Sequence, residues 1–406
     1  MYIRRHIEKV VGKCEKTFPA TLITGPRQVG KSTLLRNYAK DVKYVTFDNS
    51  RILEAIKQDS QGFVELQGTP VVFDEVQRGP SCFIDIKNQI EKNRHNGMYY
   101  LTGSQSYKLM EGISESLAGR VAIINMLGLS CREMAEETFD IPFLPDKKYL
   151  VKRNTKICLS GMNLWQRIHR GCMPEMHVNP EIDWEIFYDS YIDTYLQRDV
   201  RDLKQVDDLL SFKKFMVALA ARVGSILNMA DVAKDVGVSA PTIKTWISVL
   251  EASNIIHLLR PYSRNVTKRV IKTPKVYFTD TGLAAHLTRW LTPETLANGA
   301  MAGNIFENFV VGEILKSYYN AGRAPEMYYF RNTDGKEIDI VLYENGTLYP
   351  LEIEKKSNPT NSDIKAFDLL GAYFPSDKIE TGGVICTSRE LLPMASGNYV
   401  IPVEFI

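Results

Sequence analysis

The sequence predicts an α/β protein in which a parallel sheet comes first, a largely helical region follows, and a second α/β region ends the chain. Three observations support this fold class. Between residues 17 and 130, short apolar runs alternate with longer amphipathic runs, as in a parallel sheet covered by helices. A glycine-bearing turn joins the first apolar run to the helical run after it. Beyond residue 304, an amphipathic run precedes three runs typical of strands.

The first region contains five runs typical of short strands. They cover Ala20–Thr24, Lys43–Phe47, Pro70–Phe73, Met98–Thr102 and Val121–Leu127. Helices are expected between them, including Lys31–Ala39 and Phe83–Asn93. A chain of 406 residues is too long for one hydrophobic core. We therefore expect three parts, at residues 1–135, 136–290 and 300–406.

The remaining elements follow from the same patterns. The middle part is expected to be mostly helical, with irregular stretches at Met134–Pro145 and Pro174–Asp183. A helix is expected at Ile305–Tyr319 and strands at Met327–Arg331, Glu337–Tyr343 and Thr347–Glu354.

The composition excludes several classes of protein. With 44% hydrophobic and 24% charged residues, the chain is not disordered as a whole. Fifty basic and 48 acidic residues nearly balance, so the net charge of +2 indicates no class of partner. The six cysteines form no C-x-x-C pair, which argues against a disulfide framework or a zinc ribbon. No apolar run is long enough to cross a membrane and no signal peptide is evident, so we expect a cytoplasmic protein.

The turn after the first strand is the strongest functional signal. It reads Gly25, Pro26, Arg27, Gln28, Val29, Gly30, Lys31, Ser32, a complete G-x-x-x-x-G-K-[ST] motif, and Thr33 follows. In such a P-loop, successive backbone N–H groups surround phosphate oxygens at the start of a helix. Lys31 is expected to reach the β- and γ-phosphates, and Ser32 to bind Mg²⁺. The sequence therefore predicts a site for ATP and Mg²⁺. A chance match in a glycine-bearing turn is the alternative.

A second motif supports the first. The apolar run that begins at Pro70 ends in Asp74 and Glu75, as a Walker B strand does. Asp74 is expected to hold Mg²⁺ through water, and Glu75 to orient or deprotonate the attacking water. The alternative is an ordinary strand end exposed to solvent, but the presence of the P-loop favours the functional interpretation.

Two further residues are candidates for catalysis. Ser104 ends another apolar run and is predicted to sense the γ-phosphate, although an ordinary Ser/Gly turn explains it equally well. Arg120 is predicted to neutralise transition-state charge, in its own subunit or in a neighbouring one of a homo-oligomer. A surface arginine is the alternative, and Arg27 competes for the same role.

Four runs in this order and spacing resemble a large family of prokaryotic AAA-type P-loop ATPases. They are GPRQVGKSTLL, VVFDEVQ, YYLTGSQS and SLAGRV, and family-like phrases continue downstream over nearly the whole chain. The resemblance implies an AAA-like ATPase core, a winged helix and a C-terminal domain of restriction-endonuclease-like fold. It implies no known biological role.

Residues 229–246 read as a helix-turn-helix followed by a basic stretch. Gly237 permits the turn and Ser239 can cap the second helix. Residues 260–275 contain six basic residues and no acidic one. We expect this basic stretch, as the wing of a winged helix, and the second helix to contact DNA phosphates. The alternative is that they pack against protein. The candidate contacts are Lys244, Arg264, Lys268, Arg269 and Lys272.

The C-terminal region carries a broken nuclease pattern. In restriction-endonuclease-like folds, an Asp and an E-x-K on adjacent strands bind a metal and activate water. Asp339 and Glu352 fit that pattern, and Glu307 on the preceding helix can join them as a second metal site. However, Glu354 stands where the lysine belongs, and Lys355 and Lys356 follow it. Lys355 is expected on the opposite face of the strand, whereas Lys356 returns to the correct face and is the alternative lysine. We expect a degenerate domain.

Three functions remain open. The first is an ATPase that switches a DNA- or protein-binding C-terminal half. The second is an ATP-regulated, metal-dependent DNA nuclease of the PD-(D/E)xK type. The third is an ATPase that binds a protein partner, such as a toxin or an effector, and never contacts nucleic acid.

Overall fold

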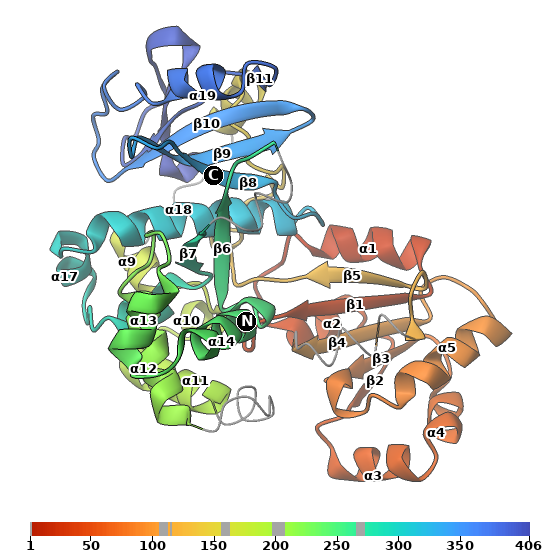
Figure 1. The fold of residues 1–406 in the computed structure, drawn as a ribbon. Coiled ribbons are helices and arrows are strands. Elements are labelled where there is room, and N and C mark those ends of the chain that lie inside the picture. Colours follow the sequence, from red (N-terminus) through yellow and green to blue (C-terminus); the bar gives the residue numbers. More distant parts are fainter. Residues whose placement is uncertain (1, 105–112, 114–115, 156–162, 197–207, 265–272) are drawn as a thin grey trace.

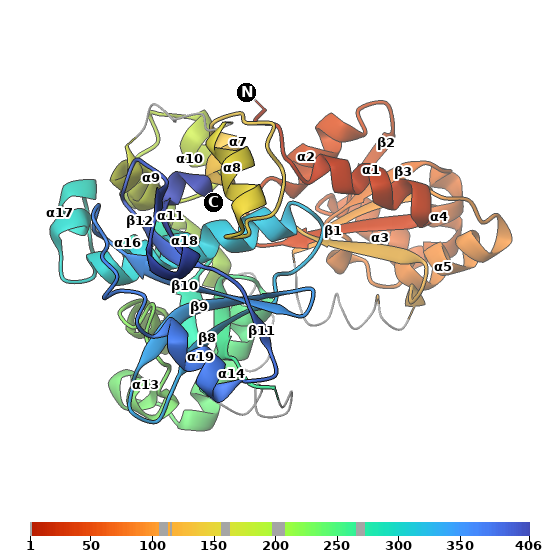
Figure 2. The same ribbon diagram turned by 90° about the horizontal axis from the view of Figure 1, so that it is seen from above.

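The computed structural model describes residues 2–104, 113, 116–155, 163–196, 208–264 and 273–406. The fold is α/β: a parallel sheet with its helices comes first, then helices, then a mixed sheet. In Figures 1 and 2, the N-terminal sheet and its helices lie to one side of the rest, and one long central helix lies between the two sheets. None of the helices in the described ranges is long and apolar enough to cross a membrane.

The N-terminal sheet follows the sequence prediction closely. Its strands are β1 (Ala20–Gly25), β2 (Lys43–Thr46), β3 (Val71–Asp74), β4 (Tyr99–Ser104) and β5 (Val121–Asn125). Their order is β2-β3-β4-β1-β5 and every pair is parallel. Because the strands are parallel, their carboxyl ends share one edge of the sheet.

Both faces of this sheet are covered. The elements that cover it are α1 (Glu8–Thr17), α2 (Lys31–Tyr38), α3 (Ser50–Gln58), α4 (Ser60–Gln67), the 3₁₀ turn η1 (Val76–Arg78) and α5 (Cys82–Lys92). Neighbouring strand residues alternate between two cores: Leu22 packs in the core that contains Phe63 and Phe83, and Ile23 in the core that contains Leu34. Successive side chains of a strand point to opposite faces of the sheet. Because both faces are buried here, the strand reads as a continuous apolar run.

The middle of the chain is helical, as expected. Its helices are α7 (Cys131–Met134), α8 (Lys147–Asn154), α9 (Leu164–Arg170), α10 (Pro174–Val178), α11 (Trp184–Tyr195) and α12 (Leu209–Ala220). The expectation that residues 174–183 are irregular was wrong for α10. Pro174 stands in the first turn of that helix, where the missing N–H has no intrahelical partner to lose. Residues 135–145 form no helix or strand.

The predicted helix-turn-helix is present as a local element. It consists of α13 (Met229–Val236) and α14 (Ala240–Ala252). Gly237 has a φ of 82°, which permits the turn, and the Ser239 side chain accepts a hydrogen bond from the Thr242 N–H. It is followed by β6 (Ile256–Pro261), β7 (Lys275–Phe278), α16 (Thr281–Leu287) and α17 (Pro293–Asn298).

The second sheet includes strands from both sides of residue 300. After α18 (Ala302–Tyr319) come β8 (Met327–Arg331), β9 (Glu337–Glu344), β10 (Thr347–Glu354), α19 (Phe367–Tyr373), β11 (Lys378–Ile379), β12 (Gly383–Cys386), β13 (Leu392–Pro393), the 3₁₀ turn Ala395–Gly397, β14 (Tyr399–Pro402) and the 3₁₀ turn Val403–Phe405. The strand order is β13-β14-β12-β10-β9-β8-β6-β7, with β11 beside β10. Thus β6 and β7, which precede the expected boundary, join the sheet through β8.

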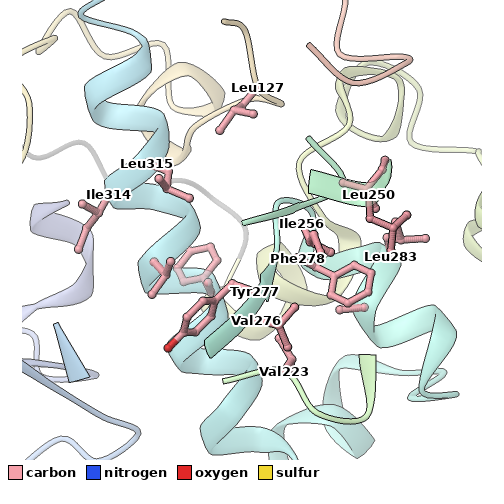
Figure 3. Packing of buried hydrophobic residues seen from close by; sticks show 14 of the residues in the cluster. Leu127, Val223, Leu250, Ile256, Val276, Tyr277, Phe278, Leu283, Ile314 and Leu315 are labelled. Carbon is pink, nitrogen blue, oxygen red and sulfur yellow. The ribbon is translucent and has the colours of Figure 1, made fainter. Parts of the chain in front are cut away.

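One hydrophobic core connects all these parts. It contains Leu34 near the P-loop, Leu250 in α14, Phe309 in α18 and Phe405 at the C-terminal end. Figure 3 shows α18 contributing Ile314 and Leu315 beside side chains from β6, β7 and the segment after β5. The helix α18 therefore touches elements from every region of the chain. The boundaries at residues 135, 290 and 300 stay predictions.

Candidate functional site

The P-loop lies at the carboxyl end of β1, between that strand and α2. Three of its residues have positive φ: Gly25 (147°), Gln28 (61°) and Gly30 (92°). A Cβ at Gly25 would stand 2.0 Å from the Met126 carbonyl oxygen, so only glycine fits there. Positive φ values of this kind let successive peptide groups curl, as in loops whose backbone N–H groups bind phosphate oxygens. Pro26 and Val29 are buried, Arg27 is half-buried, and Thr33 is exposed in α2.

Lys31 is folded onto the loop that it follows. Its side chain is only 5% exposed, and Nζ donates to the carbonyl oxygens of Gly25 at 3.0 Å and Pro26 at 2.6 Å. A buried ammonium group that donates to neutral carbonyl oxygens gains stronger hydrogen bonds when anionic oxygens replace them. This arrangement fits the binding of a triphosphate.

The expected magnesium ligands face each other. Ser32 donates a hydrogen bond to Asp74 Oδ1 at 2.7 Å, which joins the start of α2 to the end of β3. The hydroxyl of Thr102 on β4 donates to the same carboxylate oxygen. Hydroxyl and carboxylate oxygens are the hard ligands that Mg²⁺ prefers, and the ion keeps several waters in such sites. The residues present therefore fit Mg²⁺ bound with a nucleotide.

Glu75 and Ser104 belong to one hydrogen-bonded series. Glu75 adopts a left-handed conformation (φ 59°), rare for this residue type, and its N–H donates to Thr102 Oγ1 at 3.2 Å. The Gln77 amide donates both to the Glu75 carboxylate and to Ser104 Oγ, the latter at 3.2 Å. The two predicted residues are therefore connected through Gln77 at the edge of the sheet where the P-loop lies.

Arg120 lies at the opposite edge of the sheet. Its carbonyl oxygen accepts from the N–H of Ala20, the first residue of β1, whereas the P-loop follows the last residue of β1. The Arg120 guanidinium forms an ion pair with Glu91 at 2.6 Å. It therefore does not reach the P-loop of its own subunit, and a role in a neighbouring subunit stays a prediction.

Sequence reasoning missed Thr102 and Gln77. Thr102 binds Asp74, and Gln77 binds both Glu75 and Ser104. The signal available for Thr102 was its place near the end of an apolar strand, beside the predicted Ser104. No signal marked Gln77, because its contacts depend on the turn η1.

A second polar cluster surrounds Lys275 of β7. This lysine is 4% exposed, and its Nζ lies 3.0 Å from Glu307, 2.5 Å from Glu337 and 3.7 Å from Asp339. Asp339 accepts from the Ile353 N–H at 2.9 Å, next to Glu352 on β10. Of the predicted carboxylates, Glu307 and Asp339 therefore meet at Lys275, which the E-x-K pattern did not indicate, and Glu352 interacts with Asp339.

Burial and crowding shift the acids of this cluster. Burial, with the charge of Asp339, raises the pKa of Glu307 to about 7 even though Lys275 opposes the shift. Burial and Asp339 also raise the pKa of Glu352 well above its usual value. For Lys275, burial opposes the charged form, but Glu307, Asp339 and Glu337 together raise its pKa. The cluster therefore favours a positive charge at its centre.

The predicted second metal site does not fit a metal as the residues stand. Across the part of the chain that the structure describes, no three His, Cys, Asp or Glu residues are grouped so that they could hold a metal ion. The Lys275 ammonium has the position among the carboxylates that a cation would need. Lys356 pairs with Asp363 at 2.7 Å, and Lys355 donates to the carbonyl of Ala297. Neither lysine replaces the missing E-x-K lysine at residue 354.

The described part of the basic stretch is engaged in ion pairs. Arg260 pairs with Glu251 at 3.2 Å, and Lys275 belongs to the buried cluster. Arg264 forms an ion pair with Asp377 at 2.8 Å, so the expectation that it faces DNA phosphates loses support. Lys244 is exposed on α14. The predicted contacts Lys268, Arg269 and Lys272 lie outside the described residues.

Two proteins named as uncharacterized are similar to most of this chain. An uncharacterized protein of Mycobacterium tuberculosis, Rv2008c, is 28% identical over 347 residues, which are 85% of this chain and 72% of that protein. The uncharacterized protein Mb2031c of Mycobacterium bovis matches to the same extent.

Solved structures resemble the chain only distantly. The Walker-type ATPase PABY2304 of Pyrococcus abyssi has a TM-score of 0.40 at 16% identity, over 71% of this chain and 96% of that one. AMPPCP-bound DnaA from Aquifex aeolicus has a TM-score of 0.29 at 14% identity, over 60% and 85% of the two chains. Both TM-scores lie below 0.5 and indicate only a distant similarity.

Three family models match successive parts of the chain. Residues 17–135 match the family described as AAA domain, and residues 162–294 and 302–406 match two domains of unknown function, DUF8612 and DUF4143. The first match contains the P-loop, Asp74, Glu75 and Ser104, in the geometry given above. Residues 17–135 are thus an AAA-type P-loop domain, and the chain continues into a C-terminal domain of unknown function.

Proposed function

We propose that the protein binds ATP with Mg²⁺, hydrolyses it, and uses the nucleotide state to switch its C-terminal half. The observation that carries this proposal is the hydrogen-bonded series at the carboxyl ends of β1, β3 and β4. Ser32 and Asp74 would hold Mg²⁺, which would neutralise charge on the phosphates. Lys31 would bind the phosphate oxygens, and Glu75, oriented through Gln77, would accept a proton from the attacking water.

The proposal is tested with two variants. Lys31→Ala removes the cation that the loop carbonyls hold, and it should abolish ATP binding measured by calorimetry with Mg²⁺. Glu75→Gln should still bind ATP but slow hydrolysis by about 10²- to 10⁴-fold, because only the proton acceptor is lost.

Exposed residues of the same types provide the controls. Lys40→Ala and Glu54→Gln change exposed side chains and should leave binding and turnover unchanged. Hydrolysis by Glu75→Gln at the wild-type rate would refute the role of Glu75. Failure of the wild-type protein to retain nucleotide with Mg²⁺ would refute the function itself.

The C-terminal half is proposed as the responding part, with DNA or a protein as its partner. Lys244 on α14 supports contact with DNA, whereas the pairing of Arg260 and Arg264 with acids weakens it. Binding to DNA that falls steeply with salt would favour the DNA partner. Capture of one protein partner that survives nuclease treatment would favour the alternative of a protein-binding ATPase.

The nuclease alternative is not favoured. Its carboxylates Glu307, Asp339 and Glu352 converge, but the first two surround the Lys275 ammonium, and Glu354 stands where the lysine belongs. We therefore propose that this domain binds or transmits a signal without cutting nucleic acid.

A further inference from the structure

Arg5 lies outside the AAA match, in the short segment before α1, yet it contacts the P-loop. Its side chain is 3% exposed, and Nη1 donates to the carbonyl oxygen of Val29 at 2.9 Å. Val29 stands between Gln28 and Gly30, both in left-handed conformations. Arg5 therefore binds the loop at the point where its backbone is most constrained.

The contact with Val29 fixes the direction of one peptide group. In a trans peptide, the carbonyl oxygen and the N–H of the next residue point in opposite directions. When the Val29 carbonyl points at Arg5, the Gly30 N–H of the same peptide group points away from Arg5. A backbone N–H held in that direction is a donor ready for a phosphate oxygen.

The same guanidinium holds the segment that supports the loop. Its Nη2 donates to the carbonyl oxygens of Leu127 at 2.8 Å and Gly128 at 3.1 Å. This segment follows Met126, whose carbonyl oxygen closes against Gly25 at the other end of the P-loop. The Arg5 side chain thus connects Val29, near the end of the P-loop, to the segment after Met126, which packs against Gly25 at the start of the loop.

Glu133 keeps the guanidinium in place. Arg5 Nε donates to Glu133 Oε1 at 3.0 Å, and this carboxylate also accepts from the N–H groups of His6 and Ser130. Burial alone would raise the pKa of Glu133, but Arg5, Ser130 and His6 hold it below its usual value. The ion pair is therefore fixed by five hydrogen bonds to backbone groups. Arg5 donates to the carbonyl oxygens of Val29, Leu127 and Gly128. Glu133 accepts from the N–H groups of His6 and Ser130.

We propose that Arg5 is a positioning residue for the nucleotide site, holding the Val29–Gly30 peptide in the orientation that binds phosphate. This inference rests on the proposed ATP binding and deepens it. Lysine can preserve the charge beside Glu133, but it lacks the planar fork that reaches the Val29, Leu127 and Gly128 carbonyls together. Charge and positioning are therefore separable by substitution.

The test compares Arg5→Lys and Arg5→Gln with Arg153→Gln. Arg153 is 2% exposed, forms an equally buried ion pair with Glu137, and donates to the carbonyl oxygen of Glu404 near the C-terminal end of the chain. It therefore controls for the loss of a buried pair. ATP binding, kcat, KM and the melting temperature are measured for full-length variants with Mg²⁺.

Arg5→Lys and Arg5→Gln are expected to weaken ATP binding by about 10- to 100-fold, the range for one or two lost charge-assisted hydrogen bonds. Arg153→Gln should lower the melting temperature while its ATP affinity stays near that of the wild type. Wild-type affinity in both Arg5 variants, or an equal loss in Arg153→Gln, would overturn the inference. If the wild-type protein itself binds no ATP, the proposed function fails instead.

Discussion

A few ionisable residues of this protein are buried and held by hydrogen bonds. Glu307 is the clearest case outside the P-loop, because it accepts from Lys275 Nζ at 3.0 Å and from the Tyr277 hydroxyl at 2.5 Å. Burial and Asp339 nevertheless raise its pKa to about 7. The folded protein therefore binds a proton at Glu307 in a pH range where the unfolded chain, with an ordinary glutamate, does not.

This shift predicts a pH dependence of stability. Because the folded state binds more protons than the unfolded state between about pH 4.5 and 7, the contribution of Glu307 falls as pH rises through that range. Glu307→Gln should therefore make the free energy of unfolding fall less between pH 5.5 and 7.5 than in the wild type. Urea denaturation in the presence of EDTA measures the free energy of unfolding at each pH, and Glu294→Gln, at an exposed residue, is the control. Parallel curves for wild type and Glu307→Gln would contradict the assigned pKa.

At the scale of elements, β7 joins two parts of the chain that the sequence separates. It pairs with β6, and its Lys275 reaches Glu307 on α18 and both Glu337 and Asp339 on β9. Two carboxylates on one strand and one on a helix thus contact a single cation from another strand, and Glu337 also pairs with Arg331 at 3.4 Å. Removal of Lys275 would take the counter-charge away from Glu307 and Asp339, which is costly for buried carboxylates.

Lys275→Met is expected to destabilise the protein by about 3–5 kcal/mol, as for other broken buried ion pairs. The freed carboxylates should also bind Mn²⁺ in the absence of nucleotide, which calorimetry would detect, whereas the wild type should bind none there. The exposed Lys336→Met serves as the matched control. Two results would contradict this prediction and support the nuclease alternative. One is Mn²⁺ binding by the nucleotide-free wild type that is lost in Asp339→Asn. The other is cleavage of plasmid DNA that requires Mn²⁺.

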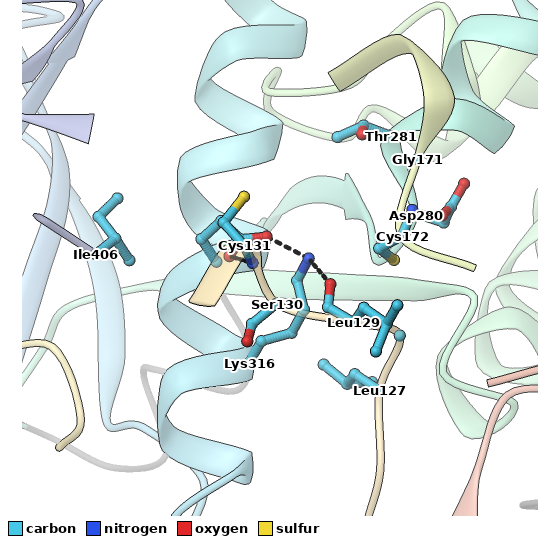
Figure 4. A network of polar contacts seen from close by, with 12 residues as sticks. Leu127, Leu129, Ser130, Cys131, Gly171, Cys172, Asp280, Thr281, Lys316 and Ile406 are labelled. Carbon is cyan, nitrogen blue, oxygen red and sulfur yellow. Dashed lines mark hydrogen bonds and ion pairs between the residues drawn. The ribbon is translucent and has the colours of Figure 1, made fainter. Parts of the chain in front are cut away.

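At the scale of the whole molecule, α18 connects the AAA domain to the C-terminal sheet. Lys316 donates to the carbonyl oxygen of Leu129 at 3.1 Å and pairs with Glu313, which accepts from the Cys131 N–H at 2.8 Å (Figure 4). The segment from Leu127 to Glu133 is therefore held by Arg5 on one side and by α18 on the other. The same helix carries Glu307.

This arrangement predicts that ATP binding alters hydrogen exchange in α18. In the wild type, MgATP should change the exchange of amides in residues 302–319. Glu313→Gln, which removes the charge that holds Lys316, should abolish that change while the Kd for ATP stays within about twofold, since no P-loop contact is lost. The exposed Glu326→Gln should behave as the wild type does. An unchanged response of α18 in Glu313→Gln would show that coupling does not pass through this contact.

Much of the fold was predictable because local patterns agree with it. The strands of the first sheet and β8 to β10 lie within a few residues of their predicted bounds, since apolar runs and turns define them locally. The P-loop conformation was predictable for the same reason: its glycines and its place between strand and helix are sequence features. The helix α10 was missed, although its proline stands in the first turn, where a helix tolerates it.

The sequence by itself determined the class of nucleotide site, the parallel sheet beneath it and the convergence of Glu307, Asp339 and Glu352. Tertiary structure alone decided that Lys275 stands among carboxylates of that group, that Arg264 faces Asp377, and that Arg120 lies away from its own P-loop. It also decided that Arg5 holds Val29. The physical reason is distance along the chain: these contacts join residues 24 to 113 positions apart, and no periodicity or motif encodes which charges meet when separate elements pack.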